Sequence, residues 1–287
     1  MEGAYGRNWN LKGLLGDLIG TTAELVPEPR AEIWASDLGK PYIDRWLQMK
    51  GVPYSNPPNG QDLMAFYLGK QIELGFAQML TRCGIAYRSQ ERLAIAEPGC
   101  LPVAGRPDLL LEVKDWQALL DAAEDQSSDA RTTLPRQALQ RLLQGWRERC
   151  PDGLPLTVFE IKSLNSQAFK YHRGNGGLSS AYPHHRLQLY TYLRGLKLGE
   201  GHLLYVARDT GWIEEAVIRP NEELEAEWLA DVATMSRYYL EDQQPPREPV
   251  TVEGRANWRV SYSRYKDHLY NHPESAEKEA SHGPFSF

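Results

Sequence analysis

An aspartate and a Glu-x-Lys pair have the residue types and positions that metal-assisted hydrolysis needs. Asp108 stands at the start of an apolar run, where a carboxylate requires an explanation, and Glu160 and Lys162 flank one residue at the end of another short apolar run. Alternate residues of a strand share a face, so Glu160 and Lys162 should point to one side while Phe159 and Ile161 point to the core. Carboxylate oxygens bind hard divalent cations, and a neighbouring ammonium orients water or offsets charge on a phosphate.

A second Glu-x-Lys, Glu112-Val113-Lys114, competes for this role, and an isolated pair of this kind is more often an ordinary surface feature. Asp108 and Glu112 would lie on one strand, four residues apart, which is roughly 13 Å at about 3.3 Å per residue. They could not share one cation. Asp108 and Glu160 lie on different strands and meet if those strands pair, so the second Glu-x-Lys is the better candidate.

The elements that must position these residues follow from hydrophobic periodicity and turn signals. A helix is predicted from Ser36, as N-cap, to about Lys50. Further helices are expected at 61–83, 134–150, 183–198 and 221–240, and strands at 85–96, 101–103, 107–114, 156–161, 202–207 and 212–218. Residues 119–131 are polar and acidic and suggest a surface excursion. This order predicts an α/β fold with helices packed on a central mixed sheet.

Composition excludes some classes of protein. The chain has 287 residues, of which 41% are hydrophobic and 24% charged. No apolar run approaches the roughly 18 residues of a membrane helix, and the first residues lack the features of a signal peptide, so a cytoplasmic protein without a membrane partner is expected. Three distant cysteines fit no metal-ligand spacing and should be reduced. A net charge of −6 argues mildly against nucleic acid, yet residues 162–199 contain no Asp or Glu and could face a polyanion.

Pro107-Asp108 followed by Glu160-Ile161-Lys162 resembles the signature of the PD-(D/E)XK nuclease superfamily. Two further features resemble its RecB-like branch, which includes CRISPR-adaptation nucleases and phage exonucleases: Gln188 and Tyr192 in a Q-x-x-x-Y motif, and Glu73 on the helix before the sheet. The likeness covers roughly residues 33–270. It implies a restriction-endonuclease-like core with a helical insertion, about residues 115–155, between the two catalytic strands.

The resemblance also implies roles for these residues. Asp108, Glu160 and the backbone carbonyl of Ile161 would ligate Mg²⁺ or Mn²⁺, with Glu73 in support, and Lys162 would position the attacking water. A carboxylate such as Glu73 on an apolar helical stripe is costly unless a metal or a core lysine pairs with it. Gln188 and Tyr192, four residues apart on a helix, would hold the Glu-x-Lys strand or touch the DNA backbone, and plain helix packing is a close alternative.

Many members of this branch carry an iron–sulfur cluster, and the chain departs from that pattern. Residues 258–269 resemble the cluster-binding segment, but the three ligand positions are Val260, Ser263 and Leu269, and the stretch 36–42, which resembles the site of the first cysteine, has none. Without thiolates no cluster is expected. Either packing replaces it, through Trp258, Tyr262 and Tyr265, or the match to this segment is accidental.

Basic residues around a glycine loop at 174–177 fit contacts to DNA phosphates. They are Lys170, His172, Arg173, His184, His185 and Arg186. Adjacent helix residues diverge by about 100°, so His184 and His185 are not expected to share a metal ion. The predicted organisation is an N-terminal extension (1–30), a nuclease domain (31–271) and a disordered tail (272–287).

The function expected from these observations is a metal-dependent deoxyribonuclease, foremost an exonuclease in DNA processing, repair, phage or CRISPR-type systems. Its partners would be DNA, as single strands or duplex ends, and proteins of recombination, repair or CRISPR adaptation. The alternatives are a non-catalytic DNA-binding adaptor with a nuclease fold in an integration or repair complex, a restriction-type endonuclease, and an unrelated α/β scaffold with coincidental motifs.

Overall fold

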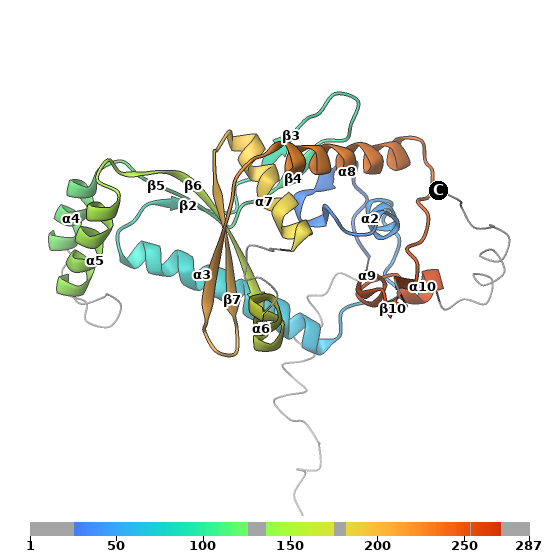
Figure 1. Ribbon diagram of the computed structural model, residues 1–287, viewed down its shortest axis with the longest axis horizontal. Helices are drawn as coiled ribbons and strands as arrows, with labels where there is room; N and C mark the ends of the chain where they lie inside the picture. Colours follow the sequence, from blue (N-terminus) through green and yellow to red (C-terminus); the bar gives the residue numbers. More distant parts are fainter. Residues whose placement is uncertain (1–25, 126–135, 175–181, 253, 271–287) are drawn as a thin grey trace, which may run out of the picture. The chain divides into compact units, whose positions relative to one another are not determined.

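The computed structural model describes residues 26–125, 136–174, 182–252 and 254–270, which fall into two compact units (Figure 1). The second unit comprises Glu32–Gly39 and Leu68–Thr234, and the first takes the remaining segments on either side of them. Most of the predicted N-terminal extension and all of the predicted tail lie outside the described residues. None of the described helices combines the length and apolar character that crossing a bilayer requires.

A five-stranded mixed sheet forms the centre of the second unit, in the order β2-β5-β6-β7-β8. Its strands are β2 (Tyr87–Arg88), β5 (Leu109–Val113), β6 (Leu154–Leu164), β7 (Gly201–Ala207) and β8 (Ile213–Ile218). Neighbouring strands are antiparallel except β6 and β7, which run parallel. The predicted mixed sheet flanked by helices is therefore confirmed, with β6, the strand of Glu160 and Lys162, in the middle.

Helices cover both faces of this sheet, because β6 alternates its side chains between two apolar clusters. On one face, Val158 packs with Leu189 and Leu193 of α7 (Pro183–Leu196). On the other, Ile161 packs with Ile72 and other apolar residues of α3 (Gly60–Arg82). The ribbon of Figure 1 shows α3 and α7 on opposite sides of the strands. Glu160 and Lys162, in step with Val158, therefore face α7 and not open solvent.

The insertion between β5 and β6 is helical, as predicted. It contains α4 (Trp116–Asp125) and α5 (Arg136–Arg149), which pack on the far end of β5 around a cluster that includes Trp116, Leu139 and Leu143. The expectation of a polar surface excursion over 119–131 is wrong up to Asp125, since α4 buries Ala123, and residues 126–135 lie outside the described part. The three cysteines are free thiols.

A second, three-stranded sheet has the order β1-β4-β3, formed by β1 (Ile33–Trp34), β4 (Val103–Gly105) and β3 (Leu93–Ile95). β4 leads directly to Asp108, so this sheet fixes the approach to the aspartate. Gly105 lies against α7: a Cβ there would come within 2.7 Å of the Tyr192 ring and 2.8 Å of the Ala35 Cβ.

The first unit has its own small core, in which Ile43 and Leu47 of α2 (Tyr42–Met49) pack with Tyr54, Tyr265 and Leu269. The same unit holds the end of α8 (Glu222–Leu240), the β9 (Thr251–Val252) and β10 (Arg255–Ala256) pair, α9 (Trp258–Ser261) and α10 (Lys266–Tyr270).

The predicted start of a helix at Ser36 is wrong. Ser36 lies in a short 3-10 helix, η1 (Ala35–Asp37), and α2 begins at Tyr42. A residue before proline is disfavoured in the helical conformation, so Lys40 cannot continue a helix into Pro41.

Residues 258–269, which resemble the cluster-binding segment but lack its cysteines, contribute Tyr265 and Leu269 to this small core. Val260, Ser263 and Leu269 are all buried, and Tyr265, predicted to pack there, is 1% exposed. The same prediction is wrong for Tyr262, which is 81% exposed, and the side chain of Trp258 lies outside the described part of the structure.

Candidate active site

Pairing of β5 with β6 places Asp108 beside the Glu-x-Lys strand. Leu109 is the register partner of Phe159, so the residue before it, Asp108, lies opposite Glu160. The backbone N–H of Ile161 donates a hydrogen bond of 2.8 Å to Asp108 Oδ2. Both carboxylates are buried, with Asp108 8% and Glu160 2% exposed. The strands of Asp108 and Glu160 therefore pair, which the sequence analysis gave as the condition for the two carboxylates to meet.

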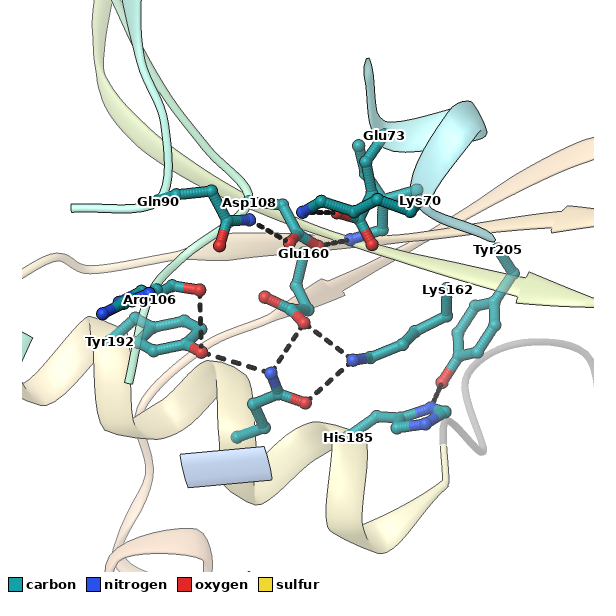
Figure 2. A network of polar contacts seen from close by, with 12 residues as sticks. Lys70, Glu73, Gln90, Arg106, Asp108, Glu160, Lys162, His185, Tyr192 and Tyr205 are labelled. Atoms are coloured by element: carbon teal, nitrogen blue, oxygen red, sulfur yellow. Dashed lines mark hydrogen bonds and ion pairs between the residues drawn. The ribbon is translucent and has the colours of Figure 1, made fainter. Parts of the chain in front are cut away.

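Lys162 and Gln188 enclose one oxygen of Glu160. Lys162 Nζ donates to Glu160 Oε1 at 2.7 Å and to Gln188 Oε1 at 2.9 Å, while Gln188 Nε2 donates to the same Glu160 Oε1 at 2.7 Å. These three side chains form a closed ring of hydrogen bonds between β6 and α7 (Figure 2). The amide of Gln188 thus orients both the carboxylate and the ammonium.

Tyr192 extends this network toward Asp108. It accepts a 3.2 Å hydrogen bond from Gln188 Nε2 and donates one of 3.3 Å to the backbone carbonyl of Arg106. Because the Q-x-x-x-Y residues lie four apart, they occupy one face of α7 and reach both β6 and the turn that precedes Asp108. Gln188 is 6% and Tyr192 1% exposed, so their contacts are with the strand and the turn.

Glu73 and Lys70 form an ion pair on α3, with Lys70 Nζ 2.6 Å from Glu73 Oε2. In Figure 2, Asp108 lies between this pair and Glu160. Burial, followed by the charge of Asp108, raises the pKa of Glu73. The lysine was not singled out by sequence, although its i, i+3 spacing from Glu73 was a visible signal.

The electrostatics of the site are dominated by carboxylates crowded together in a dry environment. Burial and the neighbouring charge of Glu160 raise the pKa of Asp108 to about 7, against the opposing effects of Lys162 and the Ile161 N–H. Burial also raises the pKa of Glu160. For Lys162 burial alone would lower the pKa, but the carboxylates of Glu160 and Asp108 outweigh it and raise the pKa. Lys162 is therefore a cation, and one ammonium faces more than one acid.

One oxygen of Glu160 is left without a partner. Oε2 is buried and receives no hydrogen bond within the described part of the chain. A buried, unpaired carboxylate oxygen costs free energy that the rest of the fold must offset. A divalent cation held by oxygen ligands would satisfy it and relieve the repulsion between Glu160 and Asp108, so the residues present fit such an ion.

The described residues contain no group of three or more His, Cys, Asp and Glu side chains arranged to hold a metal ion. Mg²⁺ does not need such a cage, because it is usually bound by one or two carboxylates together with water and substrate phosphates. Asp108 and Glu160 supply two carboxylates, and Oε2 of Glu160 has no hydrogen-bond partner among the described residues. They match the small protein ligand set that Mg²⁺ uses.

The competing Glu-x-Lys lies at the other end of β5, away from this network. Lys114 Nζ lies 3.3 Å from Glu112 Oε2, and the side chain of Lys114 is 78% exposed. Glu160 and Lys162, by contrast, belong to the buried network between β6 and α7.

The residues predicted to contact DNA lie on two helices, α6 and α7. Lys170 is exposed on α6 (Ser166–Gly174), and His184, His185 and Arg186 are half-buried in the first turn of α7. The ring of His185 is held by a 2.9 Å hydrogen bond between its Nδ1 and the hydroxyl of Tyr205. The side chains of His172 and Arg173 lie outside the described residues.

Gln90 is a contact of the site that sequence reasoning missed. Its side-chain Nε2 donates a 3.0 Å hydrogen bond to Asp108 Oδ1 (Figure 2). Gln90 lies in the loop between β2 and β3, eighteen residues from Asp108. No local pattern marked it, because a loop glutamine has no periodicity from which its partner could be inferred.

No protein-family profile and no curated protein sequence matches this chain. Among solved structures, the chain is similar to one described as SSO0001, at 17% identity and a TM-score of 0.49, covering 93% of this chain and 98% of that one. It is also similar to an alkaline exonuclease, LHK-Exo, from Laribacter hongkongensis, at 14% identity and a TM-score of 0.43, covering 74% and 90%. The same exonuclease in complex with dAMP matches at 15% identity and a TM-score of 0.42. Likenesses this low carry no argument about function, which therefore depends on the geometry of the site.

Proposed function

We propose that this chain is a metal-dependent deoxyribonuclease that hydrolyses DNA phosphodiester bonds, as an exonuclease acting on single strands or duplex ends. The observation that carries the proposal is the buried Glu160. One of its oxygens is bound by Lys162 and Gln188, while the other is buried without a hydrogen-bond partner among the described residues, and the charge of Glu160 acts on the carboxylate of Asp108. A site built only for stability would have no reason to bury a carboxylate oxygen without a hydrogen-bond donor.

Asp108, Glu160 and the backbone carbonyl of Ile161 would hold Mg²⁺ or Mn²⁺, with Glu73 in support. When bound, the ion supplies a water of lowered pKa and neutralises charge on the phosphate. Lys162 orients the water or stabilises negative charge that develops on the phosphate oxygens. Gln188 keeps the ammonium and the carboxylate aligned through its two hydrogen bonds, and Tyr192 supports Gln188.

The test compares cleavage by wild type, Lys162→Ala and Lys114→Ala, which removes the lysine of the exposed Glu-x-Lys. The substrates are end-labelled single-stranded DNA, linear duplex, closed circular duplex and RNA, each with Mg²⁺, Mn²⁺ or EDTA. We expect metal-dependent shortening of DNA from its ends by wild type and Lys114→Ala, and a loss of about 100-fold or more in Lys162→Ala. Removing Lys162 leaves the buried carboxylate of Glu160 without its ammonium partner and can destabilise the fold. Asp108→Asn therefore provides a second variant, in which the substituted group is neutral.

Each of the other outcomes would assign a different function to this chain. Cleavage of the closed circle indicates an endonuclease, and preference for RNA changes the substrate class. DNA binding without cleavage in either metal favours the adaptor, whose partners would be proteins of recombination, repair or CRISPR adaptation. Equal activity of wild type and both Lys162→Ala and Asp108→Asn would remove the site from the reaction altogether.

A further inference from the structure

Gln90 adopts a backbone conformation that glutamine rarely occupies. Its φ is +55°, in the left-handed region that favours glycine and asparagine. Within the described residues, the other non-glycine residues with positive φ are Lys197 and Asp242. Both follow the ends of long helices, α7 and α8, where a left-handed residue is an ordinary cap. Gln90 lies in a loop between two short strands and caps no helix, so its conformation needs another explanation.

The explanation lies in what Gln90 contacts. Its backbone N–H donates to the carbonyl of Pro107 at 3.0 Å, and its side-chain amide donates to Asp108 Oδ1 at 3.0 Å. The left-handed turn thus brings one residue onto both the backbone and the side chain of Pro107-Asp108. Glycine would adopt the same backbone without strain, but it has no amide to offer the carboxylate.

The two oxygens of Asp108 are held by donors from two different elements. Oδ1 accepts from Gln90 and Oδ2 from the backbone N–H of Ile161 on β6. A single donor would leave the carboxylate able to rotate about its last bond, whereas two donors define its plane. Each carboxylate oxygen has more than one acceptor direction, so both remain able to bind a cation. Both donors are neutral groups, so neither adds a positive charge next to the carboxylate.

We propose that Gln90 is a positioning residue that holds the Asp108 carboxylate in the orientation required for a divalent cation, and that the strained turn is retained for this purpose. The inference rests on the proposed function, since it assigns Asp108 to the cation. Partners of metal ligands generally affect metal affinity or activity by about 10- to 100-fold. Relief of backbone strain, by contrast, acts on stability, so the two effects can be separated.

The experiment uses the full chain with two substitutions that both remove the amide. Gln90→Gly relaxes the backbone, while Gln90→Met keeps the side-chain length and the strain. Asp242→Gly is the control, because it relieves a left-handed residue whose exposed ion pair with Lys50 contributes little. Mn²⁺ binding is measured by calorimetry, the Mn²⁺ concentration for half-maximal DNA cleavage by titration, and Tm without metal.

We expect both Gln90 variants to bind Mn²⁺ about 10- to 100-fold more weakly and to need correspondingly more Mn²⁺ for cleavage. The Tm of Gln90→Gly should equal or exceed that of wild type and lie above that of Gln90→Met, and Asp242→Gly should bind Mn²⁺ normally. Wild-type Mn²⁺ affinity in Gln90→Gly would overturn the inference, as would a weakened affinity that tracks a lowered Tm. If wild type neither binds Mn²⁺ nor cleaves DNA, the proposed function itself fails and the inference falls with it.

Discussion

At the scale of single residues, the two oxygens of Glu160 are treated differently by the fold. Oε1 accepts from Lys162 and Gln188, whereas Oε2 is buried with no donor in the described structure. Removing a carboxylate from water is costly, and a folded protein normally offsets this cost with hydrogen bonds to both oxygens. The asymmetry leaves part of this cost unbalanced at Oε2, the oxygen that a cation would satisfy under the proposed function.

A half-buried acid in the first unit, Asp44, predicts how stability depends on pH. Burial raises its pKa from 3.8 to about 6, although a hydrogen bond from Ser263 and the charge of Lys40 oppose the shift. The folded state therefore holds this proton more tightly than the unfolded chain. The stabilisation of the folded state that this bound proton provides is complete below pH 3.8 and is lost as the pH rises through about 6.

Asp44→Asn should accordingly stabilise the protein at neutral pH but not in acid. The advantage of the variant over wild type should grow between pH 4 and pH 7 by up to about 3 kcal/mol, at about 1.36 kcal/mol per pKa unit. Denaturant unfolding at several pH values measures it, with Asp152→Asn, at an exposed turn, as the charge control. A difference that stays constant with pH would contradict the assignment.

At the scale of elements, the site depends on α7 lying flat against β4 and β6. The hydroxyl of Tyr192 reaches the carbonyl of Arg106, just after β4, while Gln188 one turn earlier reaches Glu160 on β6. Trp228 Nε1 of α8 donates to Thr191 Oγ1 at 2.9 Å and ties α7 in place from its other side. The alignment of Lys162 is therefore set by how closely one helix approaches two strands.

Gly105→Ala tests this close approach. The added methyl group would meet the Tyr192 ring at 2.7 Å and the Ala35 Cβ at 2.8 Å, and overpacking of this kind costs about 1–3 kcal/mol. Because the shift is imposed on Tyr192 and through it on Gln188, we expect cleavage at saturating DNA to fall more than the folded fraction does.

The matched control is Gly145→Ala on α5, where the added methyl group meets nothing within 4 Å. It should be neutral or stabilise the helix by roughly 0.5–1 kcal/mol. Chemical unfolding and cleavage rates are measured for both variants. If Gly105→Ala retained full stability and activity, α7 could shift to accommodate the methyl group, and the site would not depend on the close packing of α7 against β4.

At the scale of the whole molecule, a net charge of −6 means that the chain as a whole does not attract DNA. Binding has to come from local groups, and residues 162–199, which contain no acidic residue, begin on β6 itself, two residues after Glu160. Lys170, which the sequence analysis assigned to DNA phosphates, is exposed on α6 and is therefore accessible to a phosphate.

Lys170→Ala, made in the Lys162→Ala background so that DNA stays intact, should weaken DNA binding at low salt. The slope of log K against log salt should fall by about one for each phosphate contact removed. Arg219→Ala is the control, since Arg219 pairs with Glu200 at 2.8 Å at the end of β8. Fluorescence anisotropy at several salt concentrations gives both slopes, and equal slopes would exclude Lys170 from the interface.

Much of the fold and part of the site could be predicted because they depend on local periodicity. Two-residue alternation on β6 places Glu160 and Lys162 together, and the four-residue spacing on α7 places Gln188 and Tyr192 on one face. The sequence alone therefore determined the order of most elements, favoured the second Glu-x-Lys over the first, and identified the pairing of β5 with β6 as the condition for a site.

Tertiary structure decided what depends on groups distant along the chain. It placed the Glu160 side of β6 under α7, so that the acid is buried; it formed α4, where composition suggested a polar excursion; and it brought a strained loop glutamine, Gln90, onto Asp108. The physical reason is that secondary structure follows from interactions between residues close in the sequence. Burial, close packing and the partner of each buried oxygen depend instead on contacts between segments that are distant in the sequence.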